Sequence, residues 1–552
     1  MSDPHDAPLL EVTDLRVAFG DTEVVHGVSL RIAPGECVAI VGESGSGKSV
    51  TARALLGMAG RGSRAESGTL RIGGRELGNA GEREWRRIRG RDVGLILQDA
   101  LVSLDPLRPV GREIDDPLRI HERMSQPERR ARVHELLASV GMPDPAFAAR
   151  RRSGELSGGL RQRALIAAAI ALDPPLLIAD EPTTALDATV QARILTLIAE
   201  IRSRGTGVLL ISHDLAVVGQ LADRILVMRG GVIVESGTAA EVLGSPREPY
   251  TRQLIAAVPS DVPRGVALTR PEPTGPTVAV LPEARRSREV DTTREPALLA
   301  LDHVSKSFAV PGGRFTAVDD VSLEVHRGET LGLVGESGSG KTTVARLALG
   351  LTAPDAGDVT LDGAPWSQLD ERSRRPQRRR IGAIYQDALS SFDPRWTVGR
   401  ILADAVGVAT AGRTPTVSNH EVAALLEQVG LEASVARRRP LTLSGGQRQR
   451  VAIARALAAA PEILICDEPV SALDVTIQAQ ILDLLDDLQR QRGLALLFIS
   501  HDLGVVRHMA DRVAVMQAGR VVETGAADRL FAEPAHPYTA RLVADAPRLA
   551  RA

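Results

Sequence analysis

The chain contains the same unit twice. Two copies of Gly-Glu-Ser-Gly-Ser-Gly-Lys end at Lys48 and Lys341, and Asp180 and Asp467 begin two copies of Asp-Glu-Pro at nearly the same spacing. Paired Leu-Ser-Gly-Gly, Ile-Ser-His-Asp-Leu and Pro-Tyr-Thr runs keep this register across most of each half. A length of 552 residues also exceeds what one hydrophobic core usually holds. The sequence therefore predicts two duplicated domains in one chain.

The region between the two copies differs in composition from both. Residues 261 to 296 contain six prolines and scattered charges, without sustained hydrophobic periodicity. Such a composition is typical of a linker. We therefore expect a first domain at 8–260, a linker at 261–296 and a second domain at 297–552.

Short apolar runs alternate with longer, Ala- and Leu-rich amphipathic stretches in each half. Runs of four or five apolar residues bounded by Gly, Asp or Ser are typical of strands buried on both faces. The runs are Cys37–Val41, Leu176–Ala179 and Val208–Ile211 in the first half, and Thr330–Val334, Ile463–Cys466 and Leu496–Ile499 in the second. Their alternation with helices predicts an α/β fold with a mostly parallel sheet.

Each of the two glycine-rich runs follows an apolar strand and precedes a helical stretch, which is the context of a phosphate-binding P-loop. Glycines let the backbone turn its N–H groups toward phosphate oxygens, and the helix N-terminus adds partial positive charge. Only three lysines occur in the chain, and two of them occupy these loops. The expected phosphate-binding residues are Gly42, Ser44, Gly45, Gly47, Lys48, Ser49 and Val50, with Gly335, Ser337, Gly338, Gly340, Lys341, Thr342 and Thr343.

Two acidic residues follow a buried strand in each half. A carboxylate at the end of a buried strand is costly unless it meets a cation or a partner. We therefore expect Asp180 and Asp467 to hold Mg²⁺ through its water shell, with Ser49 and Thr342 as direct ligands. The residues that follow the aspartates, Glu181 and Glu468, are placed to orient or deprotonate an attacking water.

One histidine follows an apolar strand in each half, within the sequence Ile-Ser-His-Asp-Leu. A lone histidine is usually structural, but the repeated strand-end position favours a contact with the γ-phosphate for His213 and His501.

Composition and charge exclude several classes of protein. Basic and acidic residues nearly cancel, which disfavours a dedicated nucleic-acid binder. Two cysteines cannot form a disulfide framework, and Cys37 and Cys466 lie in apolar runs where we expect buried strand residues. No signal peptide or membrane-spanning run is evident, so we expect a cytosolic protein or one attached to a membrane through partners.

Two further runs carry a family resemblance. Leu156-Ser-Gly-Gly-Leu-Arg-Gln-Arg163 and Leu443-Ser-Gly-Gly-Gln-Arg-Gln-Arg450 resemble the signature of ATP-binding cassette (ABC) ATPases. The resemblance implies tandem P-loop NTPase domains, each with a mostly parallel core sheet, an antiparallel β part and a helical signature subdomain. In that family the signature of one domain caps the nucleotide on the P-loop of the other. Residues Ser157, Gly159, Ser444 and Gly446 would then bind ATP, with Ser444 facing Lys48 and Ser157 facing Lys341.

The same resemblance assigns further residues. Gln98 and Gln386 match the family's Q-loop glutamine, which senses Mg²⁺ and the water and touches the membrane partner. Asp187 and Asp474 match its D-loop. Phe19 and Phe308 lie where an aromatic ring stacks on adenine, although a core phenylalanine near a strand end is also common.

The two signatures differ at one position. Leu160 stands in the first where Gln447 stands in the second, and the loss of an amide could weaken one of the sites. Both copies retain the glutamate of Asp-Glu-Pro, so both could hydrolyse ATP. We therefore expect mildly unequal sites.

Two features narrow the resemblance to the dipeptide, oligopeptide and nickel importer subfamily. Ser103–Pro106 and Ser391–Pro394 follow the Q-loops, and Glu248-Pro-Tyr-Thr251 and His536-Pro-Tyr-Thr539 follow the cassettes. This implies two permease subunits and an external solute-binding protein as partners, no nucleic acid, and a place at the cytoplasmic face of the cell membrane. No cysteine follows Cys466, so no iron–sulfur cluster is expected. The solute stays open among peptides, nickel, opines, glutathione-like molecules and sugars.

Two alternatives belong to other functional classes. A soluble tandem-cassette ATPase acting on ribosomes is disfavoured by the near-neutral charge, the proline-rich linker and the Pro-Tyr-Thr extensions. A DNA-repair or chromosome ATPase is disfavoured because zinc ligands and coiled-coil insertions are missing from the sequence.

Overall fold

The structure is a computed structural model of the chain. It describes residues 7–97, 103–184, 186–269, 296–310, 313–409, 418–471, 473–547 and 549. Two compact units are present: the first comprises Met1–Leu186, Val190–Ile255 and Pro547–Ala552, and the second comprises Asp187–Thr189 and Ala256–Ala546. Residues 256–269, which include the start of the predicted linker, belong to the second unit, and residues 270–295 lie outside the described part.

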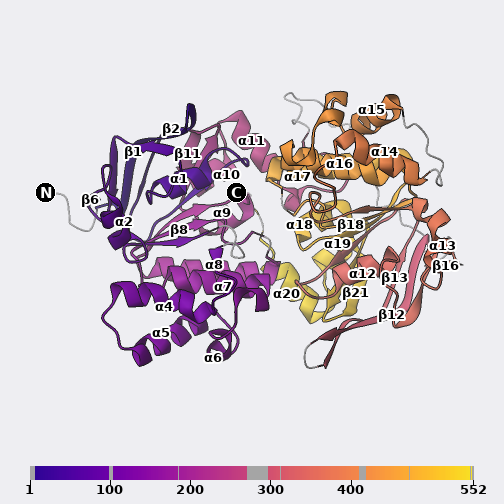
Figure 1. Cartoon of the computed structure of the whole chain (residues 1–552), viewed down its shortest axis with the longest axis horizontal. Coiled ribbons are helices and arrows are strands. Elements are labelled where there is room, and N and C mark those ends of the chain that lie inside the picture. Colours follow the sequence, from indigo (N-terminus) through magenta and orange to yellow (C-terminus); the bar gives the residue numbers. More distant parts are fainter. Residues whose placement is uncertain are drawn as a thin grey trace. The chain divides into compact units, whose positions relative to one another are not determined.

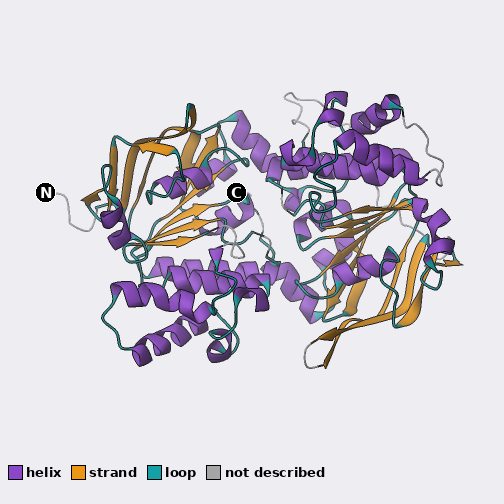
Figure 2. Cartoon of the chain, in the orientation of Figure 1, coloured by secondary structure: helices purple, strands orange, loops and turns teal. Residues whose placement is uncertain are grey.

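The first unit combines two sheets with a group of helices (Figures 1 and 2). Its strands are β1 (Leu10–Phe19), β2 (Thr22–Ile32), β3 (Cys37–Val41), β4 (Ser63–Glu66), β5 (Thr69–Ile72), β6 (Arg75–Glu76), β7 (Val93–Ile96), β8 (Leu176–Asp180), β9 (Gly207–Ile211), β10 (Arg224–Arg229) and β11 (Val232–Thr238). Its helices are α1 (Lys48–Ala54), α2 (Glu82–Ile88), α4 (Val110–His121), α5 (Gln126–Ser139), α6 (Pro145–Ala148), the 3₁₀ turn η2 (Ser153–Glu155), α7 (Gly158–Ala169), α8 (Ala188–Ser203), α9 (Leu215–Leu221), α10 (Ala239–Gly244) and α11 (Pro249–Ala256).

The core sheet of the first unit is mostly parallel, as predicted. Its order is β11-β10-β3-β9-β8-β7, and only β11 pairs antiparallel with its neighbour. Strands β3, β8 and β9 are buried along their whole length, which explains why they carry no polar alternation. The second sheet has the order β2-β1-β5-β6, with β4 also on β1, and its pairs are antiparallel.

Helices α4, α5, α6 and α7 form the group of helices that the family resemblance implied (Figure 1). Helix α4 packs on α5 and α7, and α5 packs on α6 and α7. A capping box at Ser125, with Glu128 reaching back to its N–H, starts α5. The first signature therefore begins a helix, α7, that belongs to this subdomain.

The second unit repeats the architecture. Its strands are β12 (Leu299–Val310), β13 (Gly313–Val325), β14 (Thr330–Val334), β15 (Ala356–Leu361), β16 (Ala364–Pro365), β17 (Ile381–Ile384), β18 (Ile463–Asp467), β19 (Ala495–Ile499), β20 (Arg512–Gln517) and β21 (Arg520–Ala526). Its helices are α12 (Lys341–Ala348), α13 (Glu371–Arg374), α14 (Val398–Ala409), α15 (Asn419–Gln428), α16 (Gly445–Leu457), α17 (Val475–Arg492), α18 (Leu503–Met509), α19 (Ala527–Ala532) and α20 (Pro537–Asp545). Short 3₁₀ turns are η3 (Pro259–Asp261), η4 (Arg375–Arg380), η5 (Ala433–Arg437) and η6 (Pro440–Thr442).

The sheets of the second unit have the same topology as those of the first. The mostly parallel sheet has the order β17-β18-β19-β14-β20-β21, and the antiparallel one β13-β12-β15-β16. The predicted strand residues, including Cys37 in β3 and Cys466 in β18, are buried, and burial raises the pKa of both thiols to about 12. These cysteines are packing residues, as predicted.

The segment that follows α11 is fixed on the second unit. The side chain of Leu268 is buried, and the N–H groups of Leu268 and Thr269 donate to the carboxylate of Asp483 in α17 at 2.9 and 3.0 Å. Arg264 forms an ion pair with Asp511. These contacts involve residues far apart in the sequence, so no local pattern could have separated residues 256–269 from the linker.

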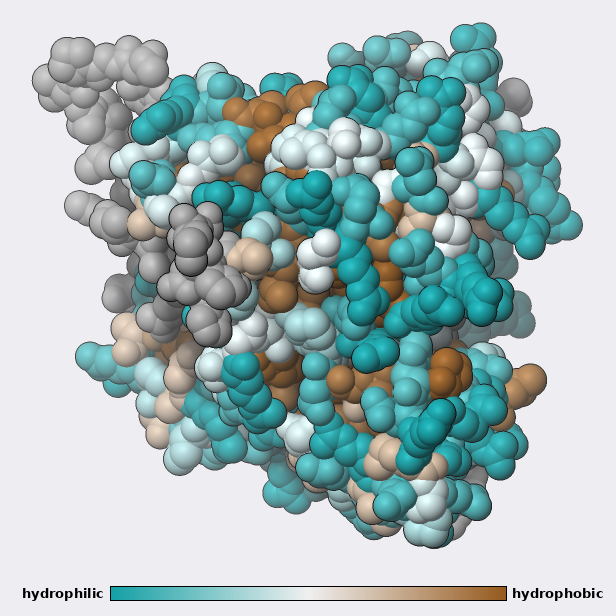
Figure 3. All heavy atoms as spheres, turned by 90° about the vertical axis from the view of Figure 1, so that its left-hand side faces the viewer, coloured by the Kyte–Doolittle hydropathy of each residue, from teal (hydrophilic) through white to brown (hydrophobic). Residues whose placement is uncertain are grey.

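Within the part of the chain that the structure describes, no helix is both long and apolar enough to span a lipid bilayer. The face shown in Figure 3 is mostly polar, and its hydrophobic residues gather in separate patches.

An ion-pair cluster joins the starts of β17 and β18. Arg380, just before β17, and Arg327 both donate to Glu462, just before β18, and Asp362 accepts from both arginines. The Arg380 hydrogen bond, together with that of Arg327, lowers the pKa of Glu462 to about 2.

We predict that Glu462→Gln lowers the free energy of unfolding of the second unit at pH 7, by no more than about 1 kcal/mol because Glu462 is partly exposed. A carboxyl group whose pKa is lower in the folded than in the unfolded state stabilises the fold at pH values above its unfolded-state pKa. This stabilisation is lost as the pH falls through the folded-state pKa. The difference from wild type should therefore shrink between about pH 4.5 and 2 in urea unfolding curves. The exposed Glu533→Gln is the control, and a difference independent of pH would contradict the prediction.

Candidate functional site

The strand order gathers the predicted residues of the first unit at one sheet edge. Strands β3, β9 and β8 are neighbours, and their register pairs Ile40 with Ile211 and Ile211 with Asp180. The phosphate loop follows β3, His213 follows β9, Asp180 is the last residue of β8, and Glu181 follows it. Because carboxyl ends of parallel strands meet at one edge, three chain segments converge there.

The first phosphate loop has the backbone geometry that its glycines predict. Gly42 has φ +148°, and a Cβ there would lie 2.1 Å from the Met228 carbonyl oxygen. Gly47, at φ +103°, is the N-cap of α1. Ser44 and Gly45 are exposed at the apex of the loop, so a ligand can reach them. Glycine is thus required at Gly42 for close backbone approach and at Gly47 for its left-handed conformation.

Lys48 is buried at the base of the loop. Its Nζ donates to the carbonyl oxygens of Gly42 at 2.7 Å and of Glu43 at 2.8 Å. A compact ammonium on a flexible stem reaches both oxygens from the first residue of α1, which explains why lysine is retained in an arginine-rich sequence.

Ser49 and Asp180 meet as expected for a cation site. The Ser49 hydroxyl donates to Asp180 Oδ1 at 2.8 Å, while Oδ2 is buried without a hydrogen-bond partner among the described residues. Burial raises the pKa of Asp180 despite the bond from Ser49. A hydroxyl and a carboxylate with an unsatisfied lone pair are ligands that Mg²⁺ accepts, so the residues present fit this ion.

Glu181 and His213 form a half-buried pair. His213 Nδ1 lies 3.1 Å from Glu181 Oε1. Burial raises the pKa of Glu181, but the hydrogen bond and charge of His213 outweigh it and hold the pKa below its usual range. Burial lowers the pKa of His213, and Glu181 more than restores it, so the net shift is upward. Each partner thus favours the charged form of the other, and a protonated His213 would keep Nε2–H as a second donor.

The backbone at this glutamate is unusual. Glu181 has φ +51° and Glu468 has φ +50°, a left-handed conformation that non-glycine residues seldom adopt. The N–H of Glu181 donates to the Ile211 carbonyl at 2.8 Å, and that of Glu468 donates to Ile499 at 2.9 Å. These bonds hold the carboxylates at the ends of their strands, and strain of this kind is concentrated at functional sites.

The second unit places its matching residues in the same way. Lys341 Nζ donates to Gly335 O and Glu336 O, both at 2.8 Å, and His501 Nδ1 lies 3.1 Å from Glu468 Oε1. Burial lowers the pKa of Lys341. The Thr342 hydroxyl lies 3.4 Å from Asp467 Oδ1, a looser contact than that of Ser49, and burial raises the pKa of Asp467.

The structure describes one of the two Q-loop glutamines. Gln386 Nε2 donates to Glu468 Oε2 at 2.7 Å, so this side chain reaches the glutamate that was predicted to handle the water. Gln98 lies outside the described residues. Within the second unit, the N–H of Ser337 donates to the carboxylate of Asp187 at 3.1 Å, which links the predicted D-loop residue to a phosphate loop.

Both signature serines are helix N-caps. Ser157 accepts from the N–H of Leu160 at 3.4 Å, and Ser444 accepts from the N–H of Gln447 at 3.2 Å. The Gln447 amide oxygen also accepts from the N–H of Ser444, which completes a capping box. Leucine at 160 cannot return this bond, so the sequence difference becomes a difference in helix capping.

The signature glycines allow close packing below these caps. A Cβ at Gly159 would lie 3.0 Å from Val190, and one at Gly446 would lie 2.6 Å from Ile477. The two candidate adenine-stacking rings, Phe19 and Phe308, are each 37% exposed. They are therefore not core side chains, and Lys306 Nζ lies over the Phe308 ring at 6.0 Å from its centroid.

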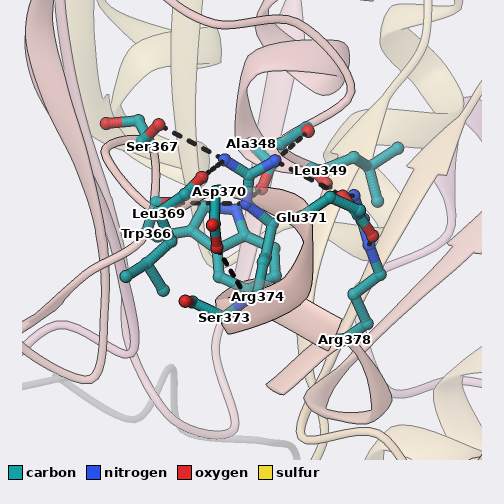
Figure 4. Close-up of polar contacts among 11 residues, drawn as sticks. Ala348, Leu349, Trp366, Ser367, Leu369, Asp370, Glu371, Ser373, Arg374 and Arg378 are labelled. Atoms are coloured by element: carbon teal, nitrogen blue, oxygen red, sulfur yellow. Dashed lines mark hydrogen bonds and ion pairs between the residues drawn. The ribbon is translucent and has the colours of Figure 1, made fainter. Parts of the chain in front are cut away.

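The far end of each phosphate-binding helix is held by arginine, which the sequence did not indicate. In the second unit the guanidinium of Arg374 donates to the carbonyls of Gly350, Trp366, Ser367 and Leu369 (Figure 4). Arg378 donates to Leu349 O, and Trp366 Nε1 donates to Ala348 O. In the first unit Arg89 donates to Leu56 O and Gly57 O. Trp366 thus satisfies the last carbonyl of α12, and the arginines bind carbonyls of the turn that follows each helix.

We predict that Leu160→Gln completes the missing capping box and slows amide hydrogen exchange in the first turn of α7 by about 2- to 5-fold, as expected for 0.5–1 kcal/mol. Gln447→Leu should accelerate exchange in the first turn of α16 by a similar factor. Mass spectrometry of peptic peptides from the full chain measures both. Leu160→Met is the control. Hydrogen exchange that neither Leu160→Gln nor Gln447→Leu alters would contradict the prediction.

Two family models match the chain, each of them in both repeats. The family model described as "ABC transporter" matches residues 25–184 and 318–471, and the model described as "Oligopeptide/dipeptide transporter, C-terminal region" matches residues 234–284 and 522–552. The first model covers both phosphate loops and both Asp-Glu pairs. The second covers the segments that contain the Pro-Tyr-Thr runs.

Relatives similar to the chain match it along its whole length. It is 42% identical to the oligopeptide transport ATP-binding protein OppD of Mycobacterium tuberculosis, over 98% of this chain and 99% of the relative. It is 42% identical to the glutathione import ATP-binding protein GsiA of Salmonella typhimurium, over 99% and 91%. It is 41% identical to the peptidoglycan transport ATP-binding protein YejF of Agrobacterium fabrum, over 99% and 98%. Together with the duplicated site, these matches show that the chain belongs to the ABC transporter family of ATP-binding proteins.

Proposed function

We propose that the chain is the ATP-hydrolysing subunit of a membrane importer for peptides or a related small solute, such as a glutathione-like molecule, an opine or nickel. The observation that carries this proposal is that both units hold a phosphate loop, an aspartate with its hydroxyl partner, and a glutamate–histidine pair with matching contacts. The match to the oligopeptide transporter C-terminal region in both repeats supports the solute class.

The residues divide the work of hydrolysis between them. Lys48 or Lys341 and the loop N–H groups bind the phosphates of ATP, and Phe19 or Phe308 stacks on the adenine. Ser49 with Asp180, and Thr342 with Asp467, would hold Mg²⁺, which neutralises charge on the phosphate oxygens when bound. Gln98 in the first site and Gln386 in the second would contact the Mg²⁺ of that site and its attacking water.

Glu181 or Glu468 accepts a proton as water adds to the γ-phosphorus and the bond between that phosphorus and the bridging oxygen breaks, which yields ADP and phosphate. The imidazolium of His213 or His501 keeps the carboxylate ionised through Nδ1, and its Nε2–H is available to the γ-phosphate. Two donors to that phosphate, the lysine ammonium and the histidine Nε2–H, stabilise the charge that develops on its oxygens.

Transport would follow from closure of the two cassettes on ATP. Ser157 and Gly159 would cap the nucleotide bound at Lys341, and Ser444 and Gly446 the one bound at Lys48. Only the closed state would contact the γ-phosphate from both sides, so hydrolysis would reopen it. Two permease subunits at the cytoplasmic face of the cell membrane and an external solute-binding protein are the partners that this proposal requires.

We predict that Glu181→Gln and Glu468→Gln together lower phosphate release by the full chain at least about 100-fold, the contribution expected of a general base, without loss of nucleotide binding. The single variants should lose activity unequally because the signatures differ at residue 160. The exposed Glu200→Gln is the matched control. Full activity in the double variant would contradict the assigned role of the glutamates.

The importer assignment requires its own experiment. The chain, co-expressed with permease and solute-binding genes adjacent to its own, should drive uptake of radiolabelled di- and oligopeptides into proteoliposomes, and uptake should stop in the Glu181→Gln/Glu468→Gln variant. Co-purification with ribosomes or nucleic acid instead of permeases would overturn the assignment. Uptake of a non-peptide solute alone would support the importer assignment and contradict peptides as the solute.

A further inference from the structure

The Pro-Tyr-Thr runs start helices that are anchored in the same way in both units. In the first unit the carboxylate of Glu235, in β11, accepts from the N–H groups of Arg247 and Glu248 at 2.7 and 3.2 Å, just before α11. In the second, Glu523 in β21 accepts from the N–H groups of Ala535 and His536 at 2.9 and 3.0 Å, just before α20. The position of the tyrosine that follows is thus fixed relative to the core sheet.

Each tyrosine hydroxyl contacts a phosphate loop. The N–H of Glu43, the second residue of the first loop, donates to Tyr250 Oη at 3.0 Å, and the N–H of Glu336 donates to Tyr538 Oη at 3.0 Å. The two tyrosines are only 4% and 3% exposed. Burial raises the pKa of Tyr538 to about 12, so the phenol stays neutral under ordinary conditions.

The same loop residue also holds the lysine. Glu43 donates its N–H to Tyr250 and accepts Lys48 Nζ with its carbonyl oxygen at 2.8 Å. Glu336 does both with Tyr538 and Lys341, again at 2.8 Å for the lysine. A continuous chain of contacts therefore runs from the extension helix through one residue of the loop to the phosphate-binding ammonium, in both copies.

We propose that the hydroxyl groups of Tyr250 and Tyr538 hold the phosphate loops in their nucleotide-binding conformation, so that the C-terminal extension of each repeat sets the nucleotide affinity of its own loop. Both are positioning residues, since each acts through the loop backbone. The inference rests on the proposed function, because it requires that nucleotide binds at these loops.

The alternative is that each tyrosine only fills space between its helix and the sheet. Phenylalanine separates the two roles, since it keeps the ring and removes the hydroxyl. Without the hydroxyl, the N–H of Glu43 or Glu336 loses its acceptor beside a buried ring, and the loop gains freedom that nucleotide binding must remove. A space-filling role predicts no change in nucleotide affinity.

The test measures binding apart from hydrolysis. In the full chain carrying Glu181→Gln and Glu468→Gln, Tyr250→Phe with Tyr538→Phe should raise the Kd for a fluorescent ATP analogue, in the presence of Mg²⁺, by about 3- to 10-fold. In the chain that retains Glu181 and Glu468, the two tyrosine substitutions should raise KM for ATP by a similar factor. They should change kcat by less than about twofold, because the lost interaction stabilises bound ATP and the transition state equally.

Leu254→Val with Leu542→Val is the matched control. These leucines lie one turn further along the same helices and are only 5% and 3% exposed, and the exchange removes only one methylene group. The control should leave Kd unchanged even where it lowers the unfolding midpoint. An unchanged Kd in the tyrosine variant, or an equal rise in the control, would overturn the inference.

The outcomes also separate this inference from the proposed function. Failure of the unsubstituted chain to bind the ATP analogue would reject the proposed function itself. Binding that is indifferent to the tyrosine hydroxyls would reject only the inference. The single variants Tyr250→Phe and Tyr538→Phe each leave one loop intact, so they give the answer if the double variant does not fold.

Discussion

A buried ammonium held on the carbonyl oxygens of its own loop is the interaction on which each site depends. Lys48 and Lys341 are both nearly inaccessible, and each bonds two consecutive backbone oxygens of its loop. A buried cation without such partners would be costly, so the loop conformation and the lysine position stabilise each other. The glycines, the strand before the loop and the helix after it all serve this arrangement.

The surrounding fold holds that arrangement from three directions. Neighbouring strands bring the Asp-Glu pair and the histidine to the same edge as the loop. Arginine and tryptophan donors satisfy the carbonyls at the far end of the helix, as Arg374 and Trp366 show in the second unit. The extension tyrosine accepts from the loop backbone. A loop that must bind a triphosphate repeatedly is thereby kept close to one conformation, which lowers the entropy lost on binding.

The two copies are alike in the residues predicted to bind phosphate and differ beside them. The Ser49–Asp180 contact is shorter than Thr342–Asp467, and the second signature has a capping box that the first lacks. The Arg–Trp support of the phosphate-binding helix is built from different sequence positions, with Trp85 in α2 but Trp366 after β16. The supporting residues therefore differ in position between the two copies, while their donors reach corresponding carbonyls.

The sequence by itself determined the duplication, the buried strands, the phosphate loops and the identity of the residues near them, because these depend on local spacing and on residue chemistry. Residues such as Glu181 and His213 were predicted from their positions after apolar runs, but their ion pair needed β8 and β9 to be neighbours. Tertiary structure alone decided the strand order, the docking of residues 256–269 on α17, and the contacts of Arg374 and Tyr538, since each joins segments far apart in the chain. Local patterns carry no information about which distant partner satisfies a given N–H or carbonyl group.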